Sequence, residues 1–265
     1  MFGMTDPQQV VSQFRRYAEE GRLEIAEVMS GELSERLSRN KDRSTEEQRW
    51  LVEALRDHTS ILHQRGKFKK SLKSWKMLNK ERKKLLNIAK TNKLDNAVLE
   101  INQQIPLDFL LGGNICTSLG KLGPAKSNYS KAIKTCPGFI DASRARVDSY
   151  LAIKGNLKKA TSATNSFIQI LESSGQVNKS GGKFVFMVDN QNPVDATMIV
   201  QRMEVWASDS NGLNTNTTTK LRGMIEDYKS QMNAIESGLQ AANAKLAAAV
   251  DKLNPTMDYH TYSRN

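Results

Sequence analysis

A 34-residue stretch, 106–139, spaces small and aromatic residues in a way that fits two closely packed helices. In its second half, Ala125, Tyr129 and Ala132 recur at i, i+4 and i+7, so they share one helical face. The two alanines let a neighbouring helix approach closely, and the tyrosine ring fills the space between them. Pro137 is expected to end this helix, because proline cannot donate a hydrogen bond to the preceding turn.

The first half of the stretch has matching features. Phe109, Gly113 and Cys116 also lie at i, i+4 and i+7, and Gly113 again permits close helix contact. Gly120 stands between the two halves, where a left-handed glycine commonly turns the chain between antiparallel helices. The pattern predicts a helix-turn-helix unit.

Seven of these positions resemble a tetratricopeptide repeat, in which aromatic, small, turn and proline positions recur in this order. Gly112 replaces the family's usual leucine, and Cys116 replaces its usual late tyrosine. The resemblance implies helix pairs that bind peptides or helices in a groove, as in adaptors, assembly factors and chaperones. The alternative without a binding role is a helical bundle whose repeats only pack a core. The matching residues are Phe109, Gly113, Gly120, Ala125, Tyr129, Ala132 and Pro137.

Weaker units flank this one. A unit over 141–172 has its turn glycine, Gly155, 35 residues after Gly120. Upstream, helix pairs are predicted to turn at Gly66 and at Gly21. The chain is therefore expected to be all-α, with more than one repeat.

The array is predicted to be irregular. The 54 residues from Gly66 to Gly120 exceed one repeat, so we expect an extra helix at about 81–103. We place the tetratricopeptide-like array at 49–172, after an N-terminal helical segment at 1–48.

The composition changes after the array, and 173–191 reads as a linker rich in serine and glycine. Within it, 183–188 has strand character without an obvious partner strand, and a loop packed under helices fits equally well. Asn192 and Pro193 are expected to cap and begin a short helix in the C-terminal region, 192–265.

A heptad pattern runs through 217–254 and predicts a long coiled-coil-type helix. A second seam, offset by four residues, becomes alanine-rich toward the end of the helix. The helix could fold back on the chain, pair with a second copy or dock on another protein, and we favour oligomerisation or partner docking. The main seam consists of Ile225, Met232, Leu239, Leu246 and Leu253.

The net charge of +11 is concentrated between residues 65 and 93, where twelve Lys or Arg accompany one acid, Glu81. Such a segment is a solvated helix face, or it attracts an acidic protein, nucleic acid or an anionic membrane. Trp75 lies among the lysines and could stack on a base, but its helical spacing fits the core better. The basic surface is represented by Lys69, Lys70, Lys73, Lys83 and Lys84.

Signatures of catalysis are missing from the sequence. It has no phosphate-binding glycine loop, and His58, His63 and His260 lack partners at metal-ligand spacing. Cys116 and Cys136 are expected to be reduced and buried. We therefore expect no enzyme activity, no cofactor and no metal.

No apolar run is long enough for a membrane helix, and no signal-peptide core is seen at the start. A cytoplasmic location is expected, and export without a cleaved signal stays open.

The functional prediction is a scaffold, adaptor or chaperone within a multiprotein assembly. Its groove is expected to use Asn114, Ser118, Arg144 and Asp148. These residues lie on the first helices of their units, and the resemblance to tetratricopeptide repeats implies that the first helices line the groove. One alternative is a structural component or cargo of a bacterial secretion or surface assembly, suggested by the Thr, Asn, Gln and Ala composition of the last helix. The other is a nucleic-acid-binding protein that uses residues 65–93.

Overall fold

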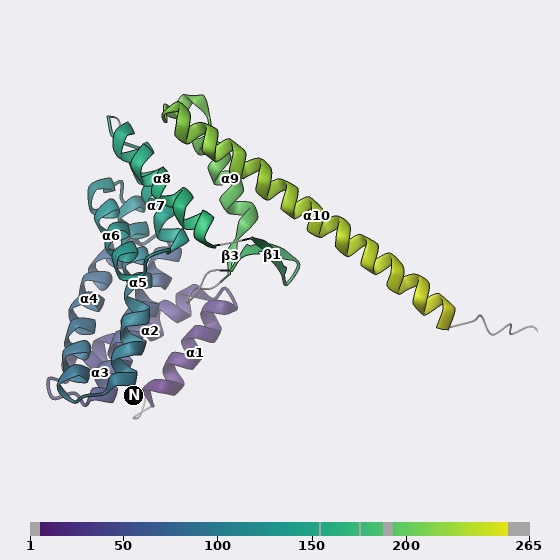
Figure 1. The fold of residues 1–265 in the computed structure, drawn as a ribbon. Helices are drawn as coiled ribbons and strands as arrows, with labels where there is room; N and C mark the ends of the chain where they lie inside the picture. Colours follow the sequence, from purple (N-terminus) through teal and green to yellow (C-terminus); the bar gives the residue numbers. More distant parts are fainter. Residues whose placement is uncertain (1–5, 154, 175, 188–192, 254–265) are drawn as a thin grey trace, which may run out of the picture. The chain divides into compact units, whose positions relative to one another are not determined.

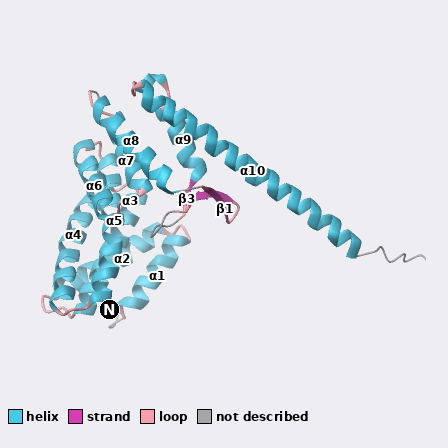
Figure 2. Ribbon diagram, in the orientation of Figure 1, coloured by secondary structure: helices cyan, strands magenta, loops and turns pink. Residues whose placement is uncertain are grey.

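The computed structural model describes residues 6–153, 155–174, 176–187 and 193–253. The chain divides into two compact units, residues 1–167 and 168–265, and each is described by itself. Figure 1 traces the chain through both units. Figure 2 shows that helices dominate and that strands are confined to one short region.

Unit 1 is built from consecutive helix pairs. From α1 to α7, each helix packs on the next, and the odd-numbered helices also contact one another, α1 with α3, α3 with α5 and α5 with α7. The odd-numbered helices therefore form one layer of the repeat. The helices are α1 (Pro7–Glu19), α2 (Leu23–Arg39), α3 (Thr45–Gln64), α4 (Phe68–Thr91), α5 (Asp95–Ser118), α6 (Leu122–Thr135), α7 (Ile140–Leu151) and α8 (Leu157–Ser174), and the division between the units falls within α8.

The predicted turn glycines lie where the helix pairs reverse. Gly120 has a φ of 69°, a conformation that a residue with a Cβ rarely adopts. The next amide, that of Lys121, donates to the carbonyl of Cys116 over 2.8 Å and satisfies the end of α5. Gly21, Gly66 and Gly155 have the same left-handed φ, so all four predicted turns are confirmed.

Two adjacent glycines in α5 allow the helices to pack closely. A Cβ on Gly113 would lie 2.2 Å from the ring of Tyr129, and one on Gly112 would lie 2.2 Å from the indole of Trp75. The aromatic side chains of α6 and α4 therefore occupy the space that side chains on α5 would need. This explains why Gly112 replaces the usual leucine.

The extra helix expected at 81–103 is a wrong prediction. Residues 81–91 continue α4, and residues 95–103 begin α5, so each of these helices has 24 residues. The chain reverses at Lys93, which has a φ of 52°. The additional residues lengthen one helix pair instead of inserting a new element.

In unit 2, the end of α8 is followed by a β-hairpin where we expected a linker. Its strands β1 (Val177–Ser180) and β2 (Lys183–Phe186) pair antiparallel, and the two glycines between them have positive φ angles, as a tight hairpin turn requires. β3 (Val194–Asp195) pairs with the other edge of β2. The strand alternative for 183–188 therefore holds for residues 183–186, which have two partner strands that the sequence did not reveal. The last residue of the predicted segment, Val188, lies outside the described residues.

The helix α9 (Ala196–Trp206) begins later than predicted. The Asp195 side chain caps it by accepting a hydrogen bond from the Met198 amide over 3.0 Å, whereas Pro193 precedes β3 and Asn192 lies outside the described residues. A short 3-10 turn, η1 (Asp209–Asn211), leads to the long helix α10 (Thr215–Leu253).

The two halves of α10 have different surroundings. Ile225 and Met232 are buried in unit 2, as is Tyr228, whose ring meets Phe186 edge to face at 5.0 Å. Further along, Leu239 is 39% exposed and Leu246 is 63% exposed. The predicted seam is therefore divided between the core of unit 2 and solvent. The side chain of its last member, Leu253, lies outside the described residues, as does residue 254 at the predicted helix end.

Within the described residues, no helix combines the length and the apolar character that crossing a membrane requires.

Candidate partner-binding groove

A cavity of about 630 Å³ lies between α1, α3, α4 and α5 of unit 1. It is lined by one residue of α1, by residues between 45 and 57 of α3, by the second half of α4, and by Leu94 and the first half of α5. We call it the α1/α3/α5 groove. Its lining residues are Arg15, Thr45, Glu46, Arg49, Val52, Glu53, Arg56, Asp57, Arg82, Leu85, Ala89, Leu94, Ala97, Glu100, Ile101, Gln103 and Gln104.

The groove has an apolar floor and a charged rim. Val52 and Leu85 are buried at the floor, and the start of α5 adds Leu94, which is 41% exposed, and Ala97. Polar and charged side chains of α3 and α5, with Arg15 of α1, surround these apolar residues. An apolar surface ringed by a few polar groups is the usual composition of a binding site.

Ion pairs tie α1 to α3 on one side of the groove. Arg15 binds Glu53 at 3.1 Å and Asp57 at 2.8 Å. Burial raises the pKa of Asp57, and the neighbouring Arg15 only partly offsets that effect. Arg49 also pairs with Glu53, at 3.4 Å. These pairs hold the rim side chains in place.

A fully buried carboxylate joins three helices below the groove. Asp108 of α5, which has no exposed side-chain surface, binds Arg56 of α3 and Arg82 of α4, each at 2.7 Å. Its backbone carbonyl also accepts a hydrogen bond from the indole of Trp75 at 2.7 Å. Because both arginines pair with this one aspartate, loss of its charge would leave both guanidinium groups without that partner.

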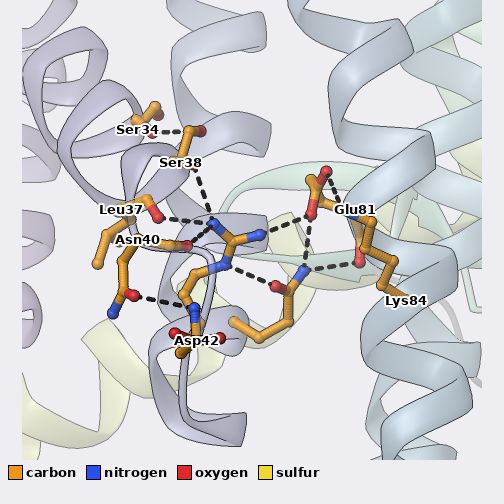
Figure 3. Close-up of polar contacts among 9 residues, drawn as sticks. Ser34, Leu37, Ser38, Asn40, Asp42, Glu81 and Lys84 are labelled. Atoms are coloured by element: carbon orange, nitrogen blue, oxygen red, sulfur yellow. Dashed lines mark hydrogen bonds and ion pairs between the residues drawn. The ribbon is translucent and has the colours of Figure 1, made fainter.

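The start of α3, which supplies part of the rim, is fixed by a second polar network (Figure 3). The guanidinium of Arg43 donates to the carbonyls of Leu37 and Ser38 at the end of α2, at 2.8 and 3.1 Å. The amide of Gln48 in α3 donates to the carboxylate of Glu81 in α4 at 3.2 Å, and Arg43 reaches the same carboxylate.

Glu81 is ionised in this network, although it is buried. Burial works against the charged form, but hydrogen bonds from Lys84 and Gln48 and the charge of Arg43 outweigh it and lower the pKa of Glu81. The only acid of the basic segment therefore serves the packing of α2, α3 and α4.

The groove residues predicted from sequence lie in the second half of α5 and in α7. The Tyr129 hydroxyl donates to the Asn114 side chain at 3.0 Å, and the charges of Arg144 and Asp148 both act on that hydroxyl. Burial raises the pKa of Tyr129. Three of the four predicted residues therefore surround one buried tyrosine.

Ser118, the fourth, lies 3.1 Å from the imidazole of His63 in α3. None of the four lines the α1/α3/α5 groove. Sequence reasoning missed the lining residues, such as Arg15, Glu53 and Ala97. The signal that pointed to this region was the long interval from Gly66 to Gly120, because the lengthened halves of α4 and α5 make the groove.

The thiols are protonated. Burial raises the pKa of both Cys116 and Cys136. Cys116 is buried as predicted, whereas Cys136 is only half-buried, so that part of the prediction is wrong. No cluster of metal-ligating side chains occurs in the part of the chain that the structure describes.

The comparisons with known proteins support the fold. No protein-family model matches the sequence, and no curated protein matches it either. Among solved structures, BtubC (BKLC) from P. vanneervenii is similar with a TM-score of 0.51 and 13% identity, over 85% of this chain and 80% of that one. The helix pairs and their left-handed turn glycines confirm an all-α, irregular tetratricopeptide-like fold, and the likeness to BtubC extends over most of this chain.

Two further structures have lower TM-scores. The C-terminal part of a TPR repeat-containing protein from Cytophaga hutchinsonii has a TM-score of 0.33 and 10% identity, over 85% of this chain and 84% of that one. MamA from Desulfovibrio magneticus RS-1 has a TM-score of 0.30 and 16% identity, over 66% of this chain and 100% of that one.

Proposed function

We propose that this chain is a non-enzymatic interaction scaffold that binds a segment of a partner protein in the α1/α3/α5 groove. The observation that carries this proposal is the cavity itself, which combines an apolar floor with a charged rim on the layer of odd-numbered helices. Its volume of about 630 Å³ suits a short segment of a partner and not a whole domain.

The rim defines the chemistry of the partner segment. Arg15 and Arg49 lie on it beside Glu46 and Glu100, so both signs of charge face the opening. A segment that places apolar side chains on the floor, flanked by both acidic and basic residues, matches this arrangement. Complementary rim charges set register and specificity, while the buried apolar contacts supply most of the affinity.

Binding suits the site better than catalysis. Ionisable groups in and below the groove are held in ion pairs, with Arg15 bound to Asp57 and with Arg56 and Arg82 bound to Asp108. A general base or nucleophile needs to be released toward a substrate, and these carboxylates instead support the helix layer.

The test is a pair of variants on the same helix. Leu94→Glu with Ala97→Glu places two charges on the apolar floor, whereas Leu99→Glu adds a charge at an exposed position of α5 outside the cavity. Each tagged protein is used to capture partners from host lysate after nuclease treatment. A photo-crosslinking residue at position 97 or 99 then reports direct contact.

We expect partners that crosslink at position 97 and that are lost from the double variant but kept by Leu99→Glu. Far-UV circular dichroism must show equal helix content in all three proteins. If the retained partners are the same for the wild type and the double variant, the groove is not the binding site and the proposal fails.

A second proposal concerns the end of α10. Leu239, Leu246 and Val250 are exposed at coiled-coil spacing, beyond the part of the helix that packs in unit 2. We propose that this stripe pairs with the same stripe of a second copy. Such self-association fits either a scaffold or a component of a larger assembly.

A further inference from the structure

Helix α4 of unit 1 displays a stripe of lysines along its length. At 100° per residue, seven lysines of α4 fall within roughly 120° of the helix circumference, and the stripe is about 32 Å long. All seven are exposed, and they are Lys69, Lys73, Lys76, Lys80, Lys83, Lys84 and Lys90. We call this set the lysine stripe.

The stripe lies opposite the packed face of α4. Leu78, Leu85 and Ala89 are buried on the side that meets the other helices, about 180° from the centre of the stripe. Arg82 and Leu85, which line the groove, are on that packed side. The lysines therefore face away from the groove and form a separate surface.

The charges of the stripe are largely uncompensated. Lys84 pairs with Glu81 at 2.9 Å, and none of the other six lysines forms an ion pair within the described residues. Lysines three and four residues apart on a helix repel one another. A row of such pairs costs stability, and an anionic ligand along the row would relieve that repulsion.

The shape of the stripe favours a linear, rigid polyanion. A duplex nucleic acid carries one charge per about 1.7 Å of its axis, whereas an acidic helix face supplies one per about 5 Å. A membrane contact usually adds inserted apolar residues, but the one large apolar side chain exposed on α4 is Met77, which is outside the stripe.

Base recognition has no support on this surface. The indole of Trp75 donates to the backbone carbonyl of Asp108 at 2.7 Å and its ring packs over Gly112, so it cannot stack on a base. Lysine ammonium groups contact phosphates as point charges and read no sequence.

We propose that the lysine stripe binds the phosphodiester backbone of double-stranded nucleic acid independently of base sequence. The stripe spans about nine base pairs at 3.4 Å each. Five or six phosphate contacts give an expected slope of log affinity against log salt of about −5. Duplexes of unrelated sequence bind equally well, and single strands bind more weakly.

The experiment uses fluorescence anisotropy with labelled 24-base-pair duplexes of DNA and of RNA, titrated with the full chain from 50 to 300 mM salt. In the test variant, Lys69, Lys73, Lys76 and Lys80 are replaced by Gln. The matched control replaces Lys121, Lys134, Lys158 and Lys159 by Gln as well. These are exposed lysines of the same unit outside the stripe. A third variant replaces the four stripe lysines by Arg.

The stripe variant is expected to bind at least about tenfold more weakly at 100 mM salt, with a slope reduced by about 3 to 4. The control and the arginine variant should stay within about twofold of the wild type in affinity. The DNA and RNA arms show which duplex binds more tightly.

Three results would overturn the proposal. The first is a wild-type protein without salt-sensitive binding to either duplex. The second is an equal loss of affinity in the stripe variant and the control, which would reflect net charge alone. The third is competition by polyglutamate at a lower charge concentration than unlabelled duplex, which would identify an acidic protein as the ligand.

Discussion

At the residue scale, the packing of unit 1 depends on positions where a side chain is absent. Replacing Gly113 by Ala would place a Cβ 2.2 Å from the ring of Tyr129, which is itself buried between α5 and α6. We expect a loss of about 1 to 3 kcal/mol in the free energy of unfolding, because the buried ring would have to shift and its hydroxyl is hydrogen-bonded to Asn114 and Thr117. Urea denaturation measures the loss.

The control for this prediction is Gly123→Ala in α6, where no atom lies within 4 Å of the added methyl group. This variant should be as stable as the wild type or slightly more stable, because alanine favours the helix. Equal effects of the two substitutions would show that α5 and α6 do not pack as closely as described.

A second residue-scale prediction concerns the buried carboxylate. Asp108→Asn removes the charge that faces Arg56 and Arg82, and Arg82 has only 4% of its side chain exposed. An arginine left buried without its partner costs about 3 to 5 kcal/mol. Glu35→Gln, which breaks an exposed pair with Arg39, should cost less than about 1 kcal/mol. Similar urea midpoints for the two variants would contradict this.

The third prediction is a pH dependence of stability. Burial lowers the pKa of His58 from its usual 6.5, while the charge of Glu27 opposes that shift. As the pH falls, His58 is therefore protonated at a higher pH in the unfolded chain than in the folded one, and stability falls as the pH drops below about 6.5. His58→Asn, which keeps an amide atom near Ser30, should make this fall shallower between about pH 7 and pH 5.

Urea unfolding followed by the fluorescence of Trp50 and Trp75, in a Trp206→Phe background, measures this dependence in unit 1. Burial also lowers the pKa of His63, so part of the dependence should remain in the variant. Parallel pH profiles of the variant and its parent would exclude His58 as the source.

At the scale of elements, the lengthened pair α4 and α5 creates the surfaces of unit 1. Each helix is 24 residues long, and the extra turns bring Leu94 and Ala97 to the groove. The same extension lets one face of α4 carry the lysine stripe. A helix pair of ordinary repeat length would lack the groove residues at the end of α4 and the start of α5, and it would lack the last lysines of the stripe.

The element-scale prediction concerns α10. If its exposed stripe pairs two copies, Leu239→Lys with Leu246→Lys should reduce the mass seen by light scattering to that of a monomer. The core of unit 2 should remain folded, because Ile225 and Met232 pack in the other half of the helix. A wild-type protein that is already monomeric would exclude the proposed pairing.

The matched control adds the same two charges on the opposite side of α10, by Ala241→Lys and Ala248→Lys. Both positions are exposed. This variant should keep the wild-type mass, and an equal effect of both double variants would mean that charge, and not the apolar stripe, controls association.

At the scale of the whole molecule, the groove and the lysine stripe are expected to act independently. They use opposite faces of α4, so a change on one leaves the other in place. Leu94→Glu with Ala97→Glu should leave duplex affinity within about twofold of the wild type. The four lysine-to-glutamine changes should leave groove crosslinking intact. Loss of both activities in either variant would show that the two surfaces are coupled.

Local spacing in the sequence determined the helix pairs and their turns. Alanine, glycine and tyrosine positions between 106 and 139 predict one helix pair, because residues three and four apart share a helical face. Glycine marks the reversals at 21, 66, 120 and 155, since a residue with a Cβ rarely adopts the required φ. The long C-terminal helix followed in the same way from its heptads.

Only the tertiary structure decided which residues meet across the chain. The contact of Arg15 with Asp57 and those of Arg56 and Arg82 with Asp108 join residues 26 to 52 positions apart. The β-hairpin was not predicted, because its first strand lies in a segment whose serine and glycine content is typical of a linker. The burial of the first half of α10 depends on that hairpin and on α9. Periodicity describes one helix at a time, whereas a groove arises where several helices pack together.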